Sequence, residues 1–216
     1  KHGKKTVDPT DPDDPYYAGT HTTADETITY VDQDGHSMEN RGVDDVTAHL
    51  DYTRTATVDA VTGEVISYGD WTPVDGDEFA AVSSKDVPGY TVDTDEVPAQ
   101  SPTISTDKDG NVVVNGVDVT VTYTAEDEDA TIHYIDEDDN NKEVKTDTIT
   151  GKTDSNGDFV IDIPAGYEID GAKTEYANGD TVTVVISADD ADDITIYMKH
   201  GKKTVDPTDP DDPYYA

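Results

Sequence analysis

The sequence predicts a mainly β protein of the α+β class, made of two related domains. Three observations lead to this prediction: short stretches in which polar and β-branched residues alternate, frequent Gly-containing turns, and a motif that occurs once in each half of the chain. Alternation with a period of two places successive side chains on opposite faces of a strand. Strands are therefore expected near residues 26–32, 50–58, 63–68, 112–124, 130–136, 144–150, 158–163, 181–187 and 193–199.

Turn residues separate most of these strands. Gly readily adopts the positive φ angles that tight turns require, and Asn or Asp before Gly is typical of hairpins. Residues 77–82 have an acidic start followed by apolar residues, and we expect one or two helical turns there, with no long helix elsewhere. The expected turns are Asp34-Gly35, Thr62-Gly63, Asp109-Gly110, Asn156-Gly157 and Asn178-Gly179.

The most informative feature is a segment that occurs at both ends of the chain. Residues 1–18 read KHGKKTVDPTDPDDPYYA, and residues 199–216 have the same sequence, which gives a period of 198 residues. A unit of this length is too long for a solenoid repeat, so each unit should have its own core. Pro alternates with Asp in the segment, which favours a semi-rigid, extended spacer. We therefore assign residues 1–18 and 200–216 as acidic, Pro-rich linkers between neighbouring repeats.

A second, weaker repeat lies inside the unit. Thr27–Asp32 matches Thr131–Asp136 at an offset of 104 residues, and each half continues to a Gly-Tyr pair shortly after a proline. The strand tyrosine and this pair are 60 residues apart in the first half and 33 in the second, so the first half has about 27 extra residues between roughly 36 and 80. The comparison predicts a longer first domain at 19–125 and a second domain at 126–199.

Composition limits the partners of the chain. The formal net charge is −36, from 14 Lys and Arg against 50 Asp and Glu. Nucleic acids and anionic lipids require basic surfaces, so we expect the chain to bind neither. No stretch approaches the roughly 18 apolar residues of a membrane helix, so membrane insertion is not expected. Cysteine is absent, and we favour an exported protein of a Gram-positive bacterium, since many of these manage without disulfides.

Several motifs follow one another in a specific order in each half. In the second half they are Tyr134-Ile135-Asp136, Thr148-Ile149-Thr150-Gly151, Ile163–Tyr167 and a final Ile-Thr-Ile-Tyr strand; in the first they are Arg54–Asp59, Val61–Glu64, Gly69-Asp70-Trp71 and Val87–Thr91. Over residues 20–199 this order resembles the mucus-binding (Mub) repeats of lactobacilli, each a pair of mucin-binding-protein (MucBP) type domains. The second half resembles the standard domain, and the first half resembles its longer companion.

The resemblance carries several expectations. It implies two tandem ubiquitin-like β-grasp domains in an elongated, monomeric repeat unit. It also implies an extracellular protein, anchored through its full-length chain to a bacterial cell wall, that binds the glycans of host mucin glycoproteins non-covalently. Two alternatives remain: a surface module that binds immunoglobulins, and a structural spacer in a long fibrous protein.

The candidate ligand-binding residues lie in and around the extra stretch of the first half. Surface arginine and aromatic residues are common in binding sites, and this stretch holds both arginines and the single tryptophan of the chain. The alternative roles are a core position for Trp71 and a cross-strand ion pair for Arg54. The candidates are Trp71, Tyr68, Tyr52, Arg54 and Arg41.

Two acidic motifs are candidates for a metal site. Asp32 with Asp34, and Asp136 with Asp138 and Asn140, have the alternate oxygen ligands that open a calcium loop. No Glu completes either motif at its twelfth position, so an acidic β-turn is the alternative. We expect some Ca²⁺ binding but no required cofactor. The sequence contains no Ser-His-Asp order, His-Glu-x-x-His motif or phosphate loop, and an enzyme is not predicted.

Overall fold

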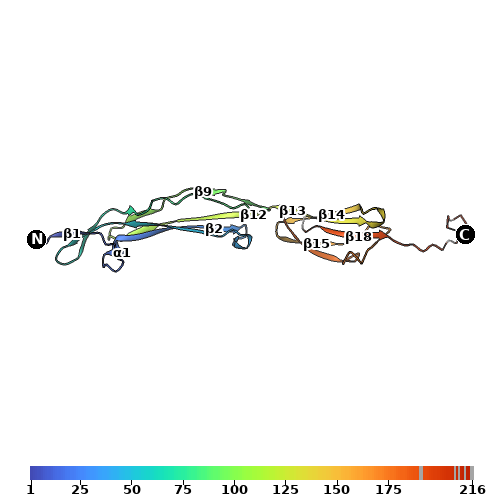
Figure 1. The fold of residues 1–216 in the computed structure, drawn as a ribbon, viewed down its shortest axis with the longest axis horizontal. Helices are drawn as coiled ribbons and strands as arrows, with labels where there is room; N and C mark the ends of the chain where they lie inside the picture. Colours follow the sequence, from blue (N-terminus) through green and yellow to red (C-terminus); the bar gives the residue numbers. More distant parts are fainter. Residues whose placement is uncertain (190–191, 207, 209, 212, 215–216) are drawn as a thin grey trace. The chain divides into compact units, whose positions relative to one another are not determined.

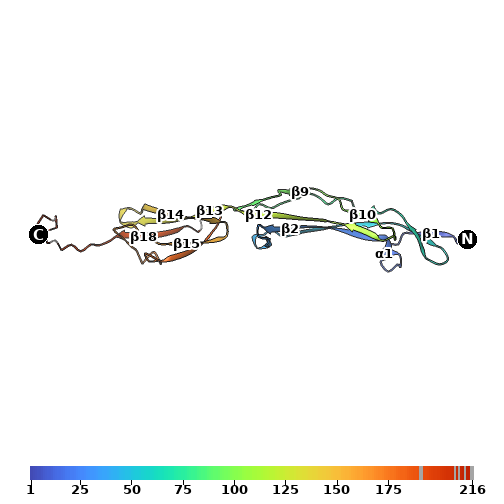
Figure 2. The ribbon, with the colours of Figure 1, turned by 180° about the vertical axis from the view of Figure 1, so that it is seen from behind.

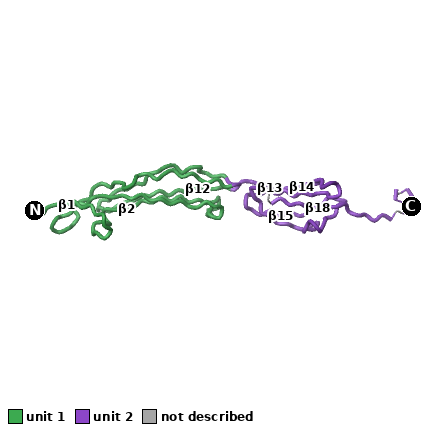
Figure 3. Tube along the Cα trace, viewed as in Figure 1, with its two compact units in different colours: residues 1–87, 91–124 green, residues 88–90, 125–216 purple. Residues whose placement is uncertain are grey.

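The computed structural model describes residues 1–189, 192–206, 208, 210–211 and 213–214. The chain divides into two compact units, drawn in different colours in Figure 3. Unit 1 comprises Lys1–Val87 and Thr91–Thr124, and unit 2 comprises Pro88–Tyr90 and Ala125–Ala216. The division after Thr124 falls beside the expected domain boundary. Within the described ranges, no helix is both long and apolar enough to cross a membrane.

Unit 1 is built on a five-stranded sheet with the order β6-β3-β2-β12-β8. Two of its strands, β2 and β12, are labelled in Figure 1. Its central strand β2 runs antiparallel to β3 and parallel to β12. Every second residue of β2 from Ala24 to Asp32 is buried, as its alternating sequence predicts. The strands of the sheet are β2 (His21–Asp32), β3 (Val46–Thr53), β6 (Thr72–Pro73), β8 (Tyr90–Val92) and β12 (Val117–Ala125).

Shorter elements surround this sheet in unit 1. A three-stranded sheet has the order β1-β4-β5, and two strand pairs are formed by β7 with β9 and by β10 with β11. Figure 2 labels β1, β9 and β10 among these strands. Two short helices, α1 and η1, flank β2 in the sequence. These elements are β1 (Lys4–Val7), α1 (Tyr17–Thr20), η1 (Glu39–Arg41), β4 (Ala56–Asp59), β5 (Val65–Tyr68), β7 (Val82–Ser83), β9 (Glu96–Val97), β10 (Thr103–Thr106) and β11 (Val112–Asn115).

Unit 2 contains a four-stranded sheet with the order β14-β13-β18-β16 and a two-stranded sheet of β15 and β17. β13 runs antiparallel to β14 and parallel to β18. The elements are β13 (Asp127–Asp136), η2 (Glu137–Asp139), β14 (Lys142–Lys152), β15 (Ser155–Val160), β16 (Tyr167–Ile169), β17 (Thr181–Ile186) and β18 (Ile194–His200).

The two main sheets share their strand order. In each, the first strand lies between an antiparallel partner and a parallel partner from the end of the unit. Thr27–Asp32 and Thr131–Asp136, the repeated motif, lie in these central strands. In both sheets the strand beyond the parallel partner begins directly after a Gly with positive φ, Gly89 (76°) before β8 and Gly166 (91°) before β16. The mainly β class is confirmed, and the strand order is compatible with the expected β-grasp fold.

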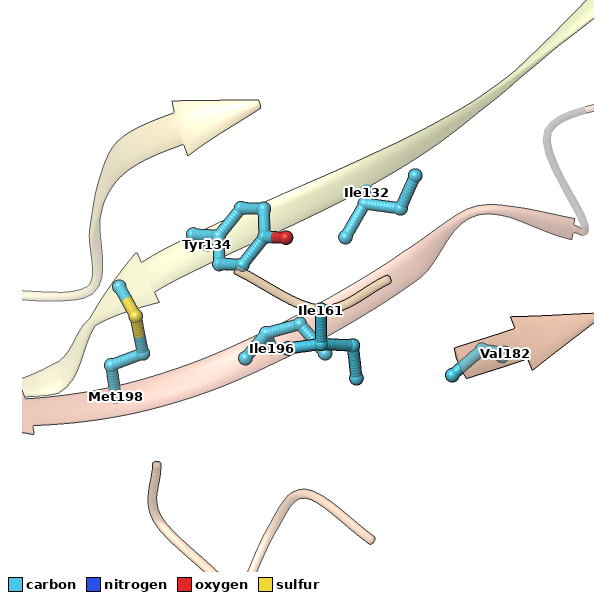
Figure 4. Packing of buried hydrophobic residues seen from close by; sticks show 6 residues of the cluster. All are labelled: Ile132, Tyr134, Ile161, Val182, Ile196 and Met198. Atoms are coloured by element: carbon cyan, nitrogen blue, oxygen red, sulfur yellow. The ribbon is translucent and has the colours of Figure 1, made fainter. Parts of the chain in front are cut away.

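The core of unit 2 is formed by side chains from both of its sheets (Figure 4). β13 and β18 turn alternate residues toward the core, and they meet Ile161, which follows β15, and Val182 of β17. Complete burial of an apolar side chain of this size contributes about 1.5–3 kcal/mol. The fully buried cluster consists of Ile132, Tyr134, Ile161, Val182, Ile196 and Met198.

Two of the expected strands are each divided in two. The strand expected at 50–58 breaks after β3, because the backbone N–H of Arg54 donates to the carbonyl of Thr20 (2.9 Å) and the chain then joins a different sheet as β4. The strand expected at 112–124 breaks at Gly116, where a Cβ would lie 2.3 Å from the carbonyl oxygen of Asp25. Only Gly permits this close approach, and here the chain passes from β11, paired with β10, to β12, paired with β2.

Two local predictions are wrong. The expected helical turns at 77–82 are absent; Phe79 instead forms an antiparallel bridge with Gln100, because so short a helix is marginal without tertiary support. Asn156 and Gly157 lie inside β15, and the reversal occurs one turn earlier, at Asp154 with φ 65°. The other expected turns have a Gly with positive φ, at positions 35, 63, 110 and 179.

The terminal segment expected to be a spacer is partly ordered. Lys4–Val7 form β1 and pair with β4, so they lie within a sheet rather than a linker. The β-branched residues Thr6 and Val7 favour a strand, and the neighbouring edge of β4 provides the backbone hydrogen-bond partners. In the second copy, His200 is the last residue of β18, whereas residues 201–206 lie outside any strand. Positions 207, 209, 212, 215 and 216 of the expected linker lie outside the described residues.

Candidate functional site

Arg54 follows the last residue of β3 and is buried in the middle of the region expected to bind a ligand. It is 4% exposed. Its Nε donates to the carbonyl of Gly19 at 2.8 Å, and its two terminal nitrogens donate to Thr106 Oγ1 at 2.9 Å and to the carbonyl of Gly110 at 2.8 Å. Among the described residues no carboxylate contacts this guanidinium, so the alternative of a cross-strand ion pair is wrong. Burial lowers the pKa of Arg54 from its ordinary value.

Two aromatic rings enclose the same guanidinium. Its central carbon lies 3.6 Å from the ring centroid of Tyr68 and 4.4 Å from that of Trp71. Such cation–π contacts are strongest where water is excluded. Arg54 therefore packs against Tyr68 and Trp71 from the interior side of these rings. A ligand could not reach the N–H groups of Arg54 without displacing the two rings. This corrects the expectation that Arg54 contacts a ligand directly.

Tyr52 of β3 lines two grooves on the surface of unit 1. The larger has a volume of about 490 Å³ and is lined mainly by hydroxyl-bearing residues of β2, β3 and the segment before them. On one side of it the rings of Tyr17 and His21 stack with their centroids 3.7 Å apart and their planes 9° apart. Thr23 Oγ1 donates to Asp51 Oδ1 at 2.8 Å. The lining residues are Thr10, Tyr17, His21, Thr22, Thr23, Asp51, Tyr52, Thr53 and Val74.

The smaller groove, of about 260 Å³, includes Trp71 and lies beside the pairing of Tyr52 with Pro73. Burial and then the nearby charge of Asp77 raise the pKa of Tyr52, so its hydroxyl stays a neutral hydrogen-bonding group at physiological pH. The residues lining this groove are Tyr52, Trp71, Pro73, Asp77, Ser101, Pro102 and Ile104. Tyr52 and Trp71 are thus brought together by the fold, as a ligand site requires.

Tyr68 and Arg41 lie apart from these two grooves. Tyr68 lines a separate depression of about 550 Å³ with Asp70 and the 106–110 turn. Arg41 lies in η1, beyond the end of β2, whereas Arg54 bonds to residues just before the start of β2. At about 3.3 Å per residue, the length of β2 separates the two arginines by roughly 36 Å. Arg41 is therefore not part of the same site.

Neither Tyr17 nor His21 was among the expected site residues: Tyr17 lies in residues 1–18, which were assigned to a linker, and His21 is the first residue of β2, just after that segment. Their spacing of four residues is the available signal, since residues at i and i+4 lie on one face of a helical turn such as α1. Asp51 was missed because carboxylates are so numerous in this chain that none stands out.

The two acidic motifs form similar clusters at the ends of β2 and β13. Asp32 and Asp34 meet His36, and Asp136 and Asp138 meet His200, with ligand atoms within 4.8 Å of one another in each group. His36 and His200 were not expected, the latter because it is distant in sequence. Asn140, the third residue of the second motif, ends η2 with φ 55°.

Hydrogen bonds already occupy the central carboxylate of each cluster. Asp32 Oδ1 accepts the backbone N–H groups of Asp34 and His36, both at 2.9 Å, and the bond from His36 outweighs burial and lowers the pKa of Asp32. Burial would raise the pKa of Asp136, but hydrogen bonds with His200, Asp138 and Tyr167 together outweigh it and lower the pKa. Both clusters thus contain the acidic turn proposed as the alternative, and calcium binding stays a prediction.

Comparison with known proteins gives one family match. Residues 18–127 match the model of the Muc B2-like domain. The MucBP domain of the adhesion protein from Pediococcus pentosaceus is 51% identical over 49% of this chain and 99% of its own, with a TM-score of 0.43. The type 2 repeat of the mucus binding protein MUB from Lactobacillus reuteri is 28% identical over 58% of this chain and 60% of its own, with a TM-score of 0.40. A comparison with curated proteins gives no match.

Proposed function

This chain belongs to the family of Muc B2-like domains, and from that premise we propose that it is a bacterial cell-surface adhesin repeat that binds the glycans of host mucins non-covalently. The family is one of adhesion domains and not of enzymes. We further propose that the full-length protein is anchored to the cell wall and displays such repeats in tandem.

The groove beside Tyr17, His21 and Tyr52 carries this proposal. Sugars present flat C–H faces that pack on aromatic rings and hydroxyl groups that donate to carboxylates. The groove combines the stacked Tyr17–His21 pair with Asp51 and a row of threonine hydroxyls. An aromatic face beside convergent polar groups is the usual composition of a small-ligand site.

The charge of the lining predicts the class of sugar. No Lys or Arg occurs among the described residues that line either groove beside Tyr52, whereas Asp51 and Asp77 are carboxylates. Anionic sugars such as sialate, or sulfated sugars, would be repelled here. We therefore propose that the preferred ligands are neutral sugars at the ends of mucin glycans. Weak binding by one unit is sufficient if repeats act together, because multivalency multiplies affinity.

A glycan array probed with the 216-residue chain tests this proposal. Tyr17→Ala and Asp51→Asn should each lower binding to neutral glycans by at least about tenfold, the effect of about 1.4 kcal/mol. Tyr176→Ala, which changes an apolar depression in unit 2, is the matched control and should leave binding intact. Binding restricted to sialylated or sulfated glycans, or unchanged in both unit 1 variants, would contradict the site.

Protein binding is the second candidate function, favoured by an exposed sheet edge. β14 is the terminal strand of its sheet and has 11 residues, so its outer backbone groups are available for strand addition. An immunoglobulin is the partner we would test first. Enzymatic removal of glycans from mucin separates the two candidates, since only glycan binding should disappear. A chain that binds neither mucin nor immunoglobulin would favour the structural spacer.

A further inference from the structure

The identical segments at the two ends of the chain have different structural settings. Both begin Lys-His-Gly-Lys-Lys-Thr-Val. In the first copy the later residues of this stretch are built into unit 1, whereas in the second copy its earlier residues are built into unit 2 (Figure 1). The histidine and the glycine make contacts in both settings, whereas Lys-Lys-Thr-Val forms a strand only in the first copy.

The first copy completes a sheet of unit 1. Lys4–Val7 pair antiparallel with Ala56–Asp59 and cover the edge of β4. Just before this strand, the carbonyl of Gly3 accepts the N–H of Ala60 at 2.9 Å. The Nδ1 atom of His2 lies 2.9 Å from Asp59 Oδ2.

The second copy completes the main sheet of unit 2. Lys199 and His200 end β18 and pair with β16. Lys199 Nζ lies 3.1 Å from Asp170 Oδ2, and His200 Nε2 lies 3.0 Å from Asp136 Oδ2. The N–H of Gly201 donates to the carbonyl of Gly166 at 2.8 Å.

The residues that follow, Lys202–Val205, are exposed and lie outside any strand of the described chain. They are the counterparts of β1. Val205 is 42% exposed, whereas its counterpart Val7 is half-buried against β4. Val205, an apolar residue that favours strands, is thus exposed to water in the copy that has no β4 strand to pair with.

The two sets of contacts use different atoms of the same peptide. The histidine uses Nδ1 in the first copy and Nε2 in the second, and the glycine uses its carbonyl in the first and its N–H in the second. We propose that one copy of the segment makes both sets at once in a tandem array. Its Lys-His-Gly closes unit 2 of one repeat, and its Lys-Lys-Thr-Val is β1 of unit 1 in the next copy of this chain. The proposal rests on the tandem arrangement within the proposed function and on no ligand.

Hydrogen exchange in a two-copy protein tests this joint. The protein consists of residues 1–216 continued by a second copy of residues 19–198, so that residues 199–216 stand before the second unit 1. Identical sequences have nearly identical intrinsic exchange rates, so the amides of 4–7 calibrate those of 202–205. In the 216-residue chain we expect protection at 4–7 only. In the two-copy protein, the same amides of 202–205 should slow by at least about tenfold, as hydrogen-bonded strand amides do. Equal rates at 202–205 in both proteins would overturn the proposal.

Proline substitution provides a second measurement. Successive N–H groups of a strand point to opposite sides, so of Lys203→Pro and Thr204→Pro one must remove a bond to β4. Lys203→Pro and Thr204→Pro should lower the melting temperature of the two-copy protein by as much as Lys5→Pro and Thr6→Pro, the corresponding substitutions in the first copy of the segment. A clear fall in melting temperature from Lys5→Pro and Thr6→Pro, with none from Lys203→Pro and Thr204→Pro, would refute the joint. Mucin binding by the same proteins reports separately on the proposed function.

Discussion

The guanidinium carbon of Arg54 lies 3.6 Å from the ring centroid of Tyr68 in the interior of unit 1. Through its hydrogen bonds, Arg54 also connects Gly19, before β2, with the turn at Gly110, which is 91 residues away in the sequence. One side chain thus joins the helix α1, the strand β5 and the β10–β11 turn. The walls of the grooves beside Tyr52 depend on this connection.

We expect Arg54→Lys to destabilise unit 1 by about 3 kcal/mol. A lysine cannot stack between two rings or donate in three fixed directions, and hydrogen bonds from a charged donor contribute about 1.5–3 kcal/mol each. Urea unfolding followed by the fluorescence of Trp71, the single tryptophan, measures the loss. Arg41→Lys, at a half-buried position in η1, also keeps the positive charge and is the control; its effect on stability should be clearly smaller. Equal effects of the two changes would contradict the role of Arg54.

Replacing Glu26 should stabilise unit 1 at neutral pH. This residue is 2% exposed on the core face of β2, its Oε2 has no hydrogen-bond partner in the described structure, and burial raises its pKa. A raised folded-state pKa means that stability is lost as pH rises from the unfolded pKa through the folded one. Glu26→Met should therefore gain about 1 kcal/mol or more at pH 7, the cost of an unpaired buried polar group, and less at pH 4. Thermal melts at both values test this; a variant less stable at pH 7 would contradict it.

Unit 2 should be more stable at pH 5.5 than at pH 8.5 because of His133. Its Nδ1 lies 2.5 Å from Glu143 Oε2 and its Nε2 lies 3.4 Å from Asp193 Oδ2. The bond with Glu143 raises the pKa of His133 despite burial. The stability from these pairs is complete below the unfolded pKa and is lost as pH rises through the folded one, by about 0.5–1 kcal/mol.

His133→Asn should remove this part of the pH dependence. The counterpart of His133 in unit 1 is Thr29, so the unfolding of unit 1, read by Trp71 fluorescence, is an internal control. A pH profile of unit 2 that is the same with and without His133 would contradict the prediction.

Mucin binding should rise as pH falls from 7 to 4. Mucins and this chain are both polyanions, and the Asp and Glu side chains become protonated near their reference pKa values of about 4. Added salt should reduce the pH dependence, since it shortens electrostatic repulsion to about 8 Å at physiological strength. Binding curves at several pH and salt values test this. A flat profile would mean that the groove beside Tyr52 outweighs net charge.

Calcium should raise the melting temperature of the chain, and EDTA should reverse the change. The clusters at Asp32 and Asp136 offer hard oxygen ligands, and a divalent cation also offsets the charge of −36. Asp136→Asn should remove the part of the effect that is specific to unit 2. An equal shift from added NaCl at the same ionic strength would show general screening and no site.

The sequence predicts most of the strands but not the side-chain interior of unit 1. Alternation and β-branched residues locate β2 and β13, because each strand has one buried face. The break at Arg54 is not predictable, because its partners Gly19, Thr106 and Gly110 are brought together only by the tertiary fold. The role of Gly157 is also set by the tertiary fold. A Cβ at this position would lie 2.7 Å from Ile149, so this glycine permits close strand packing and does not form a turn.

The candidate site was only half predicted for a related reason. Tyr52 and Trp71 stand out because they lie in the extra stretch of the first domain, which also holds both arginines, and because Trp71 is the single tryptophan. Tyr17 lies in a segment with the composition of a linker, and its place against His21 depends on the short helix α1. A composition that favours an extended chain does not prevent order where a neighbouring strand offers backbone partners.

The parallel pairing of first and last strands has a mechanical consequence. In unit 1, seven register pairs join β2 to β12, and in unit 2 five join β13 to β18. When a unit is pulled from its two ends, parallel neighbours are loaded in shear, so their hydrogen bonds must rupture together and cannot unzip one at a time. Units of this kind should stay folded under tension that would open a sheet whose strands can separate one hydrogen bond at a time.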